Sequence, residues 1–156
     1  MPTWNEERNS TMTETSRIAS PDVLLEQLQD QLRRYEKVRD TGSLREATIA
    51  IVAIEKTVRQ LGKSVGVAAG LSATSARERI RGYLEEFHGQ VIDGIELAAV
   101  SGIAQYARRI RELREEGFEI RTGPDAVDPV SGATLRSDQY VYVKSDQKAK
   151  PKRKPI

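Results

Sequence analysis

The chain has 156 residues, of which 31% are charged and 38% hydrophobic, with a formal net charge of +2. This composition is typical of helical domains with solvated outer faces, and the length has room for two small modules. The absence of cysteine excludes disulfides and Cys-rich zinc sites, and the single histidine, His88, excludes the usual zinc ligand sets and a serine triad. We therefore expect no catalytic activity, no cofactor and no metal, with His88 in a structural position at a helix end. Without a signal layout or a long apolar run, we also expect a cytoplasmic protein.

The first 62 residues are expected to form a polar arm followed by two helices. Residues 1–19 lack apolar periodicity and predict a disordered arm. Ser20, Pro21 and Asp22 form a helix start, after which apolar residues recur at alternating spacings of three and four. A break at 41–43 then leads to a second helix, so that residues 20–62 form a helical hairpin.

The second helix, at about residues 44–61, has a heptad pattern that predicts an oligomerisation seam. Ile49 and Val52 widen its apolar surface, which either packs on the C-terminal module or mediates self-association, and we favour self-association. Residues 63–74, with small side chains and glycines, predict a linker. The seam residues are Leu44, Ala47, Ile51, Ile54, Val58 and Leu61.

Residues 75–144 have the element order of a winged helix-turn-helix. We expect helices at 76–88, from Asp93 to about 100, and at 104–116, a short extended pair at 91–92, and strands at 118–122 and 139–144. In this architecture the third helix can enter the major groove of DNA. The expected fold class is therefore mainly α with a small β wing, an N-terminal helical hairpin preceding the winged helix-turn-helix domain.

Double-stranded DNA is the partner that the basic residues predict. Arginine side chains can contact guanine edges or phosphates, and lysines in the tail at 145–156, which we expect to be disordered, add salt-dependent attraction. Two alternatives remain: neighbouring glutamates neutralise the third helix, and the tail only aids solubility. The predicted DNA contacts are Gln105, Arg108, Arg109, Arg111, Arg114, Arg121, Lys150, Lys152, Arg153 and Lys154.

The C-terminal module also resembles a known group of domains. The tract VSGIAQYARRIRELREEG, from Val100 to Gly117, is similar to winged-helix modules attached to some microbial restriction and HNH-type endonucleases, and more distantly to biotin-repressor-like domains. The resemblance implies nucleic-acid binding without cleavage. The loop 123–138 departs from a short wing because it is long and contains Asp125, Asp128 and Asp138.

The hairpin segment DTGSLREATIAIVAIEKTVRQLGKSVG resembles the oligomerisation segments of phage small terminase subunits. This resemblance implies an oligomeric genome-recognition factor that acts with a packaging motor in a bacterial host cell. The alternatives are a dimeric transcription regulator that acts with the transcription machinery, and a protein-docking adaptor without DNA binding. We expect no membrane partner in any of the three cases.

Overall fold

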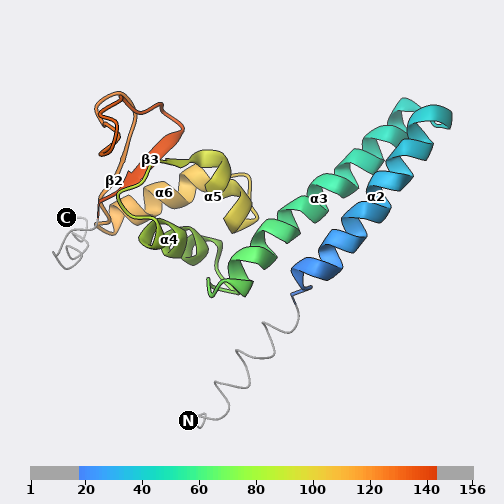
Figure 1. Ribbon diagram of the computed structural model, residues 1–156, viewed down its shortest axis with the longest axis horizontal. Coiled ribbons are helices and arrows are strands. Elements are labelled where there is room, and N and C mark those ends of the chain that lie inside the picture. The colour runs from blue at the N-terminus through green and yellow to red at the C-terminus, as the bar shows by residue number, and fades with distance from the viewer. Residues whose placement is uncertain (1–17, 144–156) are drawn as a thin grey trace, which may run out of the picture. The chain divides into compact units, whose positions relative to one another are not determined.

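The computed structural model describes residues 18–143, and the chain divides after Thr74 into two compact units. Figure 1 shows the helical hairpin of the first unit and the helix–sheet arrangement of the second. The predicted arm and basic tail lie largely or wholly outside the described residues. None of the helices within 18–143 has the length and apolar character needed to cross a bilayer.

The first unit is a hairpin of two long helices, α2 (Pro21–Thr41) and α3 (Leu44–Ala68). The hydroxyl of Ser20 accepts a hydrogen bond from the Val23 amide at 3.3 Å, as the sequence predicts for a helix start. Ser43 and Glu46 form a reciprocal capping box at the start of α3. Only two residues separate the helices, so α2 and α3 run antiparallel.

The side chains of α3 that are fully buried are small. Leu24, Ala50, Thr57 and Ser64 are buried, and the Ser64 hydroxyl donates a hydrogen bond to the Ala19 carbonyl at 2.6 Å. Small residues allow two helices to approach closely, but they leave the larger apolar side chains of α3 on its flanks.

Helix α3 extends to Ala68, beyond the end at about residue 61 that the sequence suggested. The expected linker at 63–74 is therefore helical over its first half. A glycine within a helix costs only about 1 kcal/mol relative to alanine. Burial of Ser64 and Gly66 offsets this cost, so the glycines at 62 and 66 do not end the helix.

The second unit contains three helices and a three-stranded antiparallel sheet in the order β1-β3-β2. Residues Ile92 and Arg121 pair with Tyr140 and Val141 on the central strand β3. The predicted fold class, mainly α with a small β wing, is confirmed. The elements are α4 (Ala76–Glu86), β1 (Ile92–Asp93), α5 (Gly94–Ser101), α6 (Tyr106–Glu115), β2 (Ile120–Thr122) and β3 (Gln139–Tyr142).

One hydrophobic core joins the three helices to the sheet. Its fully buried members include Ile80, Leu97 and Leu113. Tyr106 packs against this core, whereas Ala107, which its spacing of three to Ile110 places on the inward side of the predicted helix, is exposed. The buried side of the helix thus includes residue 106 instead of 107. The reason is that the aromatic ring of Tyr106 fills space next to Tyr140, with ring centroids 6.1 Å apart.

The loop between β2 and β3 is folded rather than open. Val127 and Thr134 form an antiparallel bridge, and the Asp128 carboxylate accepts hydrogen bonds from the Val130 amide and the Ser131 hydroxyl, both at 2.8 Å. A small second core of Ala126, Leu135 and Val141 supports the base of the loop.

Candidate nucleic-acid interface

Helix α6 is oriented by its apolar side, which leaves an arginine-rich side in solvent. Ile110 and Leu113 are buried and Tyr106 is half-buried, while Arg108 and Arg111 are exposed. The helix Tyr106–Glu115 contains four arginines and two glutamates, a net charge of +2. The outward face of α6 is therefore cationic.

The turn that leads into α6 is fixed by polar contacts. Gly102 adopts φ 72°, a left-handed conformation that favours glycine, and ends α5. The buried Arg79 side chain donates from Nη2 to the Ser101 carbonyl at 2.7 Å, and the Ser101 hydroxyl accepts from the Ile103 amide at 3.4 Å. Burial lowers the pKa of Arg79. These contacts hold the start of α6 against α4 and α5.

Two of the predicted DNA contacts share one carboxylate. Arg109 Nη1 donates to both Glu112 oxygens at 2.9 and 3.0 Å, and Arg108 Nε lies 3.4 Å from Glu112 Oε1. The hydrogen bond from Arg109, followed by the charges of both arginines, lowers the pKa of Glu112. One negative charge thus stands against two positive ones, so neutralisation of this cluster is incomplete.

Arg111 differs from its neighbours because it forms no ion pair within the part of the chain that the structure describes. It is exposed on the same outward side of α6 as Arg108. Gln105, at the N-terminal cap position of α6, is also exposed, and its side chain makes no capping hydrogen bond. Gln105, Arg108 and Arg111 therefore lie together on the solvent-facing side of one helix.

Arg114 and Arg121 lie outside this group. Arg114 Nε donates to the Ile120 carbonyl at 2.8 Å, a contact that ties the end of α6 to β2. Arg121 forms an ion pair with Glu119 at 2.6 Å. Arg114 is thus engaged with the backbone. Lys150, Lys152, Arg153 and Lys154 lie outside the described residues.

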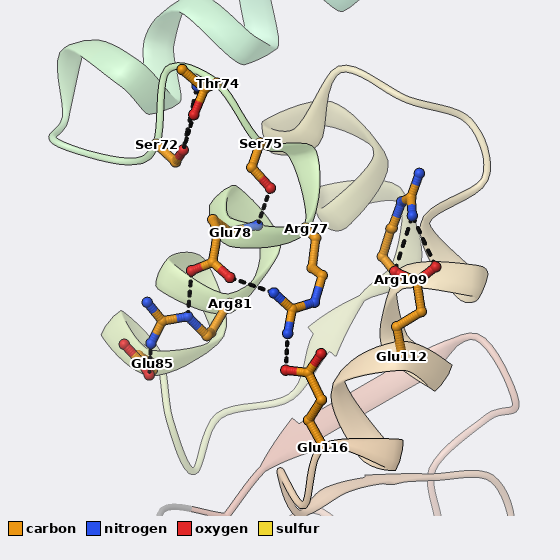
Figure 2. Close-up of polar contacts among 10 residues, drawn as sticks. All are labelled: Ser72, Thr74, Ser75, Arg77, Glu78, Arg81, Glu85, Arg109, Glu112 and Glu116. Carbon is orange, nitrogen blue, oxygen red and sulfur yellow. Dashed lines mark hydrogen bonds and ion pairs between the residues drawn. The ribbon is translucent and has the colours of Figure 1, made fainter. Parts of the chain in front are cut away.

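Sequence reasoning missed the polar brace between α4 and α6. Arg77 contacts Glu78 at 2.6 Å on its own helix and also pairs with Glu116 just after α6, as Figure 2 shows. The same figure shows the Arg109–Glu112 pair on α6. Long-range pairs of this kind leave no periodic signal, whereas the inward position of Arg79 could have been found from its spacing to Tyr83.

The acidic residues of the wing loop are largely engaged within the unit. Asp128 is held in its own turn, and hydrogen bonds from the Val130 amide and the Ser131 hydroxyl lower its pKa. Arg136 lies 3.1 Å from Asp138 and 3.3 Å from Asp93. Only Asp125 among the three loop acids singled out from the sequence has no ion pair or side-chain hydrogen bond within residues 18–143.

The described residues offer no alternative site built on metal ligands. His88 is exposed, with Nδ1 3.0 Å from the Glu85 carbonyl at the end of α4. No group of three or more His, Cys, Asp or Glu side chains within 18–143 is arranged to hold a metal ion.

The comparisons with known proteins bear on the second unit. The family model of the KpnI N-terminal domain matches residues 77–143, somewhat less than half of the chain, and this span covers α4 through β3. Searches of curated proteins and of solved structures gave no match. The segment from α4 to β3, including the arginine face of α6, is therefore similar to a KpnI N-terminal domain.

Proposed function

We propose that the second unit binds double-stranded DNA as a winged helix-turn-helix, with α6 in the major groove. The observation that carries this proposal is the outward cationic face of α6, on which Arg108 and Arg111 are exposed. Arginine in a major groove can donate two hydrogen bonds to guanine or bind phosphate. Gln105, at the start of the helix, can form two hydrogen bonds with adenine.

The topology of the unit supports this interpretation. The order of three helices and three strands, with the loop 123–138 joining β2 to β3, is the order that the sequence predicts for a winged helix-turn-helix. Because Asp128 and Asp138 are engaged locally, the wing presents less free negative charge to a phosphate backbone than its composition suggests.

The similarity to the KpnI N-terminal domain associates residues 77–143 with restriction-type endonuclease systems, in which recognition of DNA is required. We propose that this chain contributes DNA binding without a catalytic centre of its own. The role in phage genome packaging remains a hypothesis that rests on the resemblance of the hairpin, and transcription regulation and protein docking remain its alternatives.

The first test is duplex binding by an Arg108→Ala/Arg111→Ala variant, measured by fluorescence anisotropy at two salt concentrations. We expect affinity to fall at least about tenfold, and the slope of log K against log salt to become shallower by about 2, because two phosphate or base contacts are lost. The control, Arg33→Ala/Arg39→Ala on α2, removes the same charge from exposed ion-paired positions and should bind almost normally.

Equal binding by the two variants would contradict the proposal and would favour the adaptor hypothesis. Both pairs of arginines are exposed, so each variant should keep the far-ultraviolet circular dichroism and thermal midpoint of the parent chain. A loss of binding in both variants would mean that attraction depends on net charge and not on α6.

A further inference from the structure

The hairpin carries a regular row of exposed apolar side chains on each helix. On α3, Leu44, Ile51, Val58 and Val65 recur every seven residues and are 86%, 44%, 49% and 51% exposed. On α2, Leu25 and Leu32 have the same spacing and are 47% and 45% exposed. A seven-residue repeat keeps a row aligned with a neighbouring helix, so this pattern is typical of helix-to-helix packing.

Helical geometry places both rows on the same side of the hairpin. Leu25 follows the buried Leu24 by one position, and Ile51 and Val58 likewise follow the buried Ala50 and Thr57. One position is a rotation of about 100°. Because α2 and α3 are antiparallel, a rotation of about 100° about each helix axis, starting from the line where the two helices touch, leads to the same side of the hairpin. We call this surface the comb face; it comprises Leu25, Leu32, Leu44, Ile51, Val58 and Val65.

The comb face is apolar between its rows, whereas the other flank of the hairpin is mixed. The half-buried residues between the rows are Leu28, Tyr35, Ala47, Ile54 and Leu61. On the other flank, the apolar residues Val23 and Ile49, each 56% exposed, lie among the charged residues Asp30, Lys56 and Lys63. An apolar surface of this extent marks an interface.

The size of the comb face suits a stable dimer. The 25 residues of α3 span about 37 Å, and two helices side by side are about 20 Å wide, which gives on the order of 700 Å². Standard protein interfaces bury roughly 800 Å² on each partner. The hairpin therefore offers about one full interface.

The charges of the two helices favour a second copy of this chain as the occupant. Helix α2 contains five acidic and four basic residues, a net charge of −1, and α3 contains four basic and two acidic residues, a net charge of +2. Placing α2 of one copy against α3 of the other therefore brings opposite net charges together at both contacts.

We propose that two hairpins pack comb face to comb face about a two-fold axis parallel to the helices and form a four-helix bundle. Within the hairpin, the hydrogen bond from the Ser64 hydroxyl to the Ala19 carbonyl fixes which residues of the two antiparallel helices lie at the same level, and it places Leu32 level with Ile51 and Leu25 level with Val58. An axis parallel to the helices preserves these levels between copies. Leu32 of one copy thus lies level with Ile51 of the other, and Leu25 with Val58.

This arrangement changes the seam that the heptad pattern predicted. Ala47, Ile54 and Leu61 are half-buried within the hairpin, and Leu44, Ile51 and Val58 remain for the second copy. Val65 and the two α2 leucines join them. The dimer does not depend on the proposed DNA binding by α6, so the proposal of a dimer can be wrong or right independently of the proposed DNA binding.

The test is the solution mass of the full chain by sedimentation over a range of concentrations. We expect a dimer, and for Ile51→Glu/Val58→Glu a dissociation constant at least about a hundredfold higher. The matched control is Ile49→Glu/Val52→Glu, which makes the same chemical changes on α3 away from the comb face, at side chains 56% and 42% exposed. The control should remain dimeric.

Cross-linking keeps the test decisive if the glutamate variant loses helicity. The chain has no cysteine, so single cysteines are unique. A short bis-maleimide should join Leu32→Cys copies to Ile51→Cys copies, and should not join Leu32→Cys copies to Ile49→Cys copies. A monomeric parent chain at about 100 μM, a ring of more than two copies, or equal effects of the two glutamate variants would overturn the proposal.

Discussion

At the scale of single residues, Gly94 and Tyr106 fit each other closely. Gly94 is the first residue of α5, and a β-carbon built there would meet the Tyr106 hydroxyl and ring. The Tyr106 ring also packs against Tyr140, with ring centroids 6.1 Å apart, which limits how far it can move. This contact sets the distance between the start of α5 and the start of α6.

Substitution Gly94→Ala should lower the free energy of unfolding of the second unit by about 1–3 kcal/mol, because the added methyl group overpacks the core. Denaturant unfolding measures this change. In a Tyr106→Ala background the same substitution should cost much less, since the ring that it meets is gone. Equal costs in the two backgrounds would contradict the role assigned to the ring.

Tyr83 links α4 to α5 through a titratable group. Its hydroxyl donates to Glu96 Oε1 at 3.0 Å. Burial, followed by the hydrogen bond and the charge of Glu96, raises the pKa of Tyr83 to about 12. The folded state therefore holds this proton more tightly than the unfolded chain, where tyrosine has a pKa of about 10.

The stabilisation from Tyr83 should be fully present below pH 10 and should be lost as the pH rises towards 12. Tyr83→Phe cannot ionise, so its free energy of unfolding should fall less between pH 9 and pH 11 than that of the parent chain. Denaturant titrations at the two pH values provide the comparison, and parallel losses in both proteins would contradict the assignment.

At the scale of elements, Glu112 limits the positive charge that α6 can offer to DNA. Its carboxylate contacts both Arg108 and Arg109. Glu112→Gln should therefore raise duplex affinity by about threefold to tenfold and steepen the salt dependence, because a negative charge is removed and two guanidinium groups are released.

Asp30→Asn on α2 is the matched control for Glu112→Gln. Asp30 is the partner of Arg33 at 2.7 Å, and its substitution makes the same change in net charge away from α6. Anisotropy titrations of both variants separate a local effect from a global one. A similar gain in affinity for both variants would show that the gain arises from the change in net charge. A loss of affinity for Glu112→Gln would show that the carboxylate orients the arginines.

The sequence predicted the starts of helices better than their ends. Ser20, Ser43 and Ser75 cap helices, and sequence patterns predict such caps well because capping depends on residues only three positions apart. The predicted end of α3 was wrong because burial of Ser64 and Gly66 outweighs the low helix propensity of glycine. For α6, the exposed position of Arg108 followed from periodicity, but the bond from Arg114 to Ile120 joins two elements and could not.

At the scale of the whole molecule, the chain consists of two compact units with different surfaces. We propose that the apolar rows of the first unit mediate association of copies and that the arginine face of the second unit contacts DNA. A variant in one unit should therefore leave the other property intact on a DNA that contains a single site. On a DNA that contains two sites, a linked pair of units binds more tightly than either unit alone.

The contacts of Arg79 and Ser101 also bear on the thermodynamics of binding. They fix the Gly102 turn in the folded unit, so α6 is already ordered before it meets a ligand. A pre-ordered helix loses little conformational entropy on docking. Its encounter with a groove would then resemble the fit of two rigid bodies, with modest heat-capacity change and an association rate governed by electrostatic attraction and diffusion.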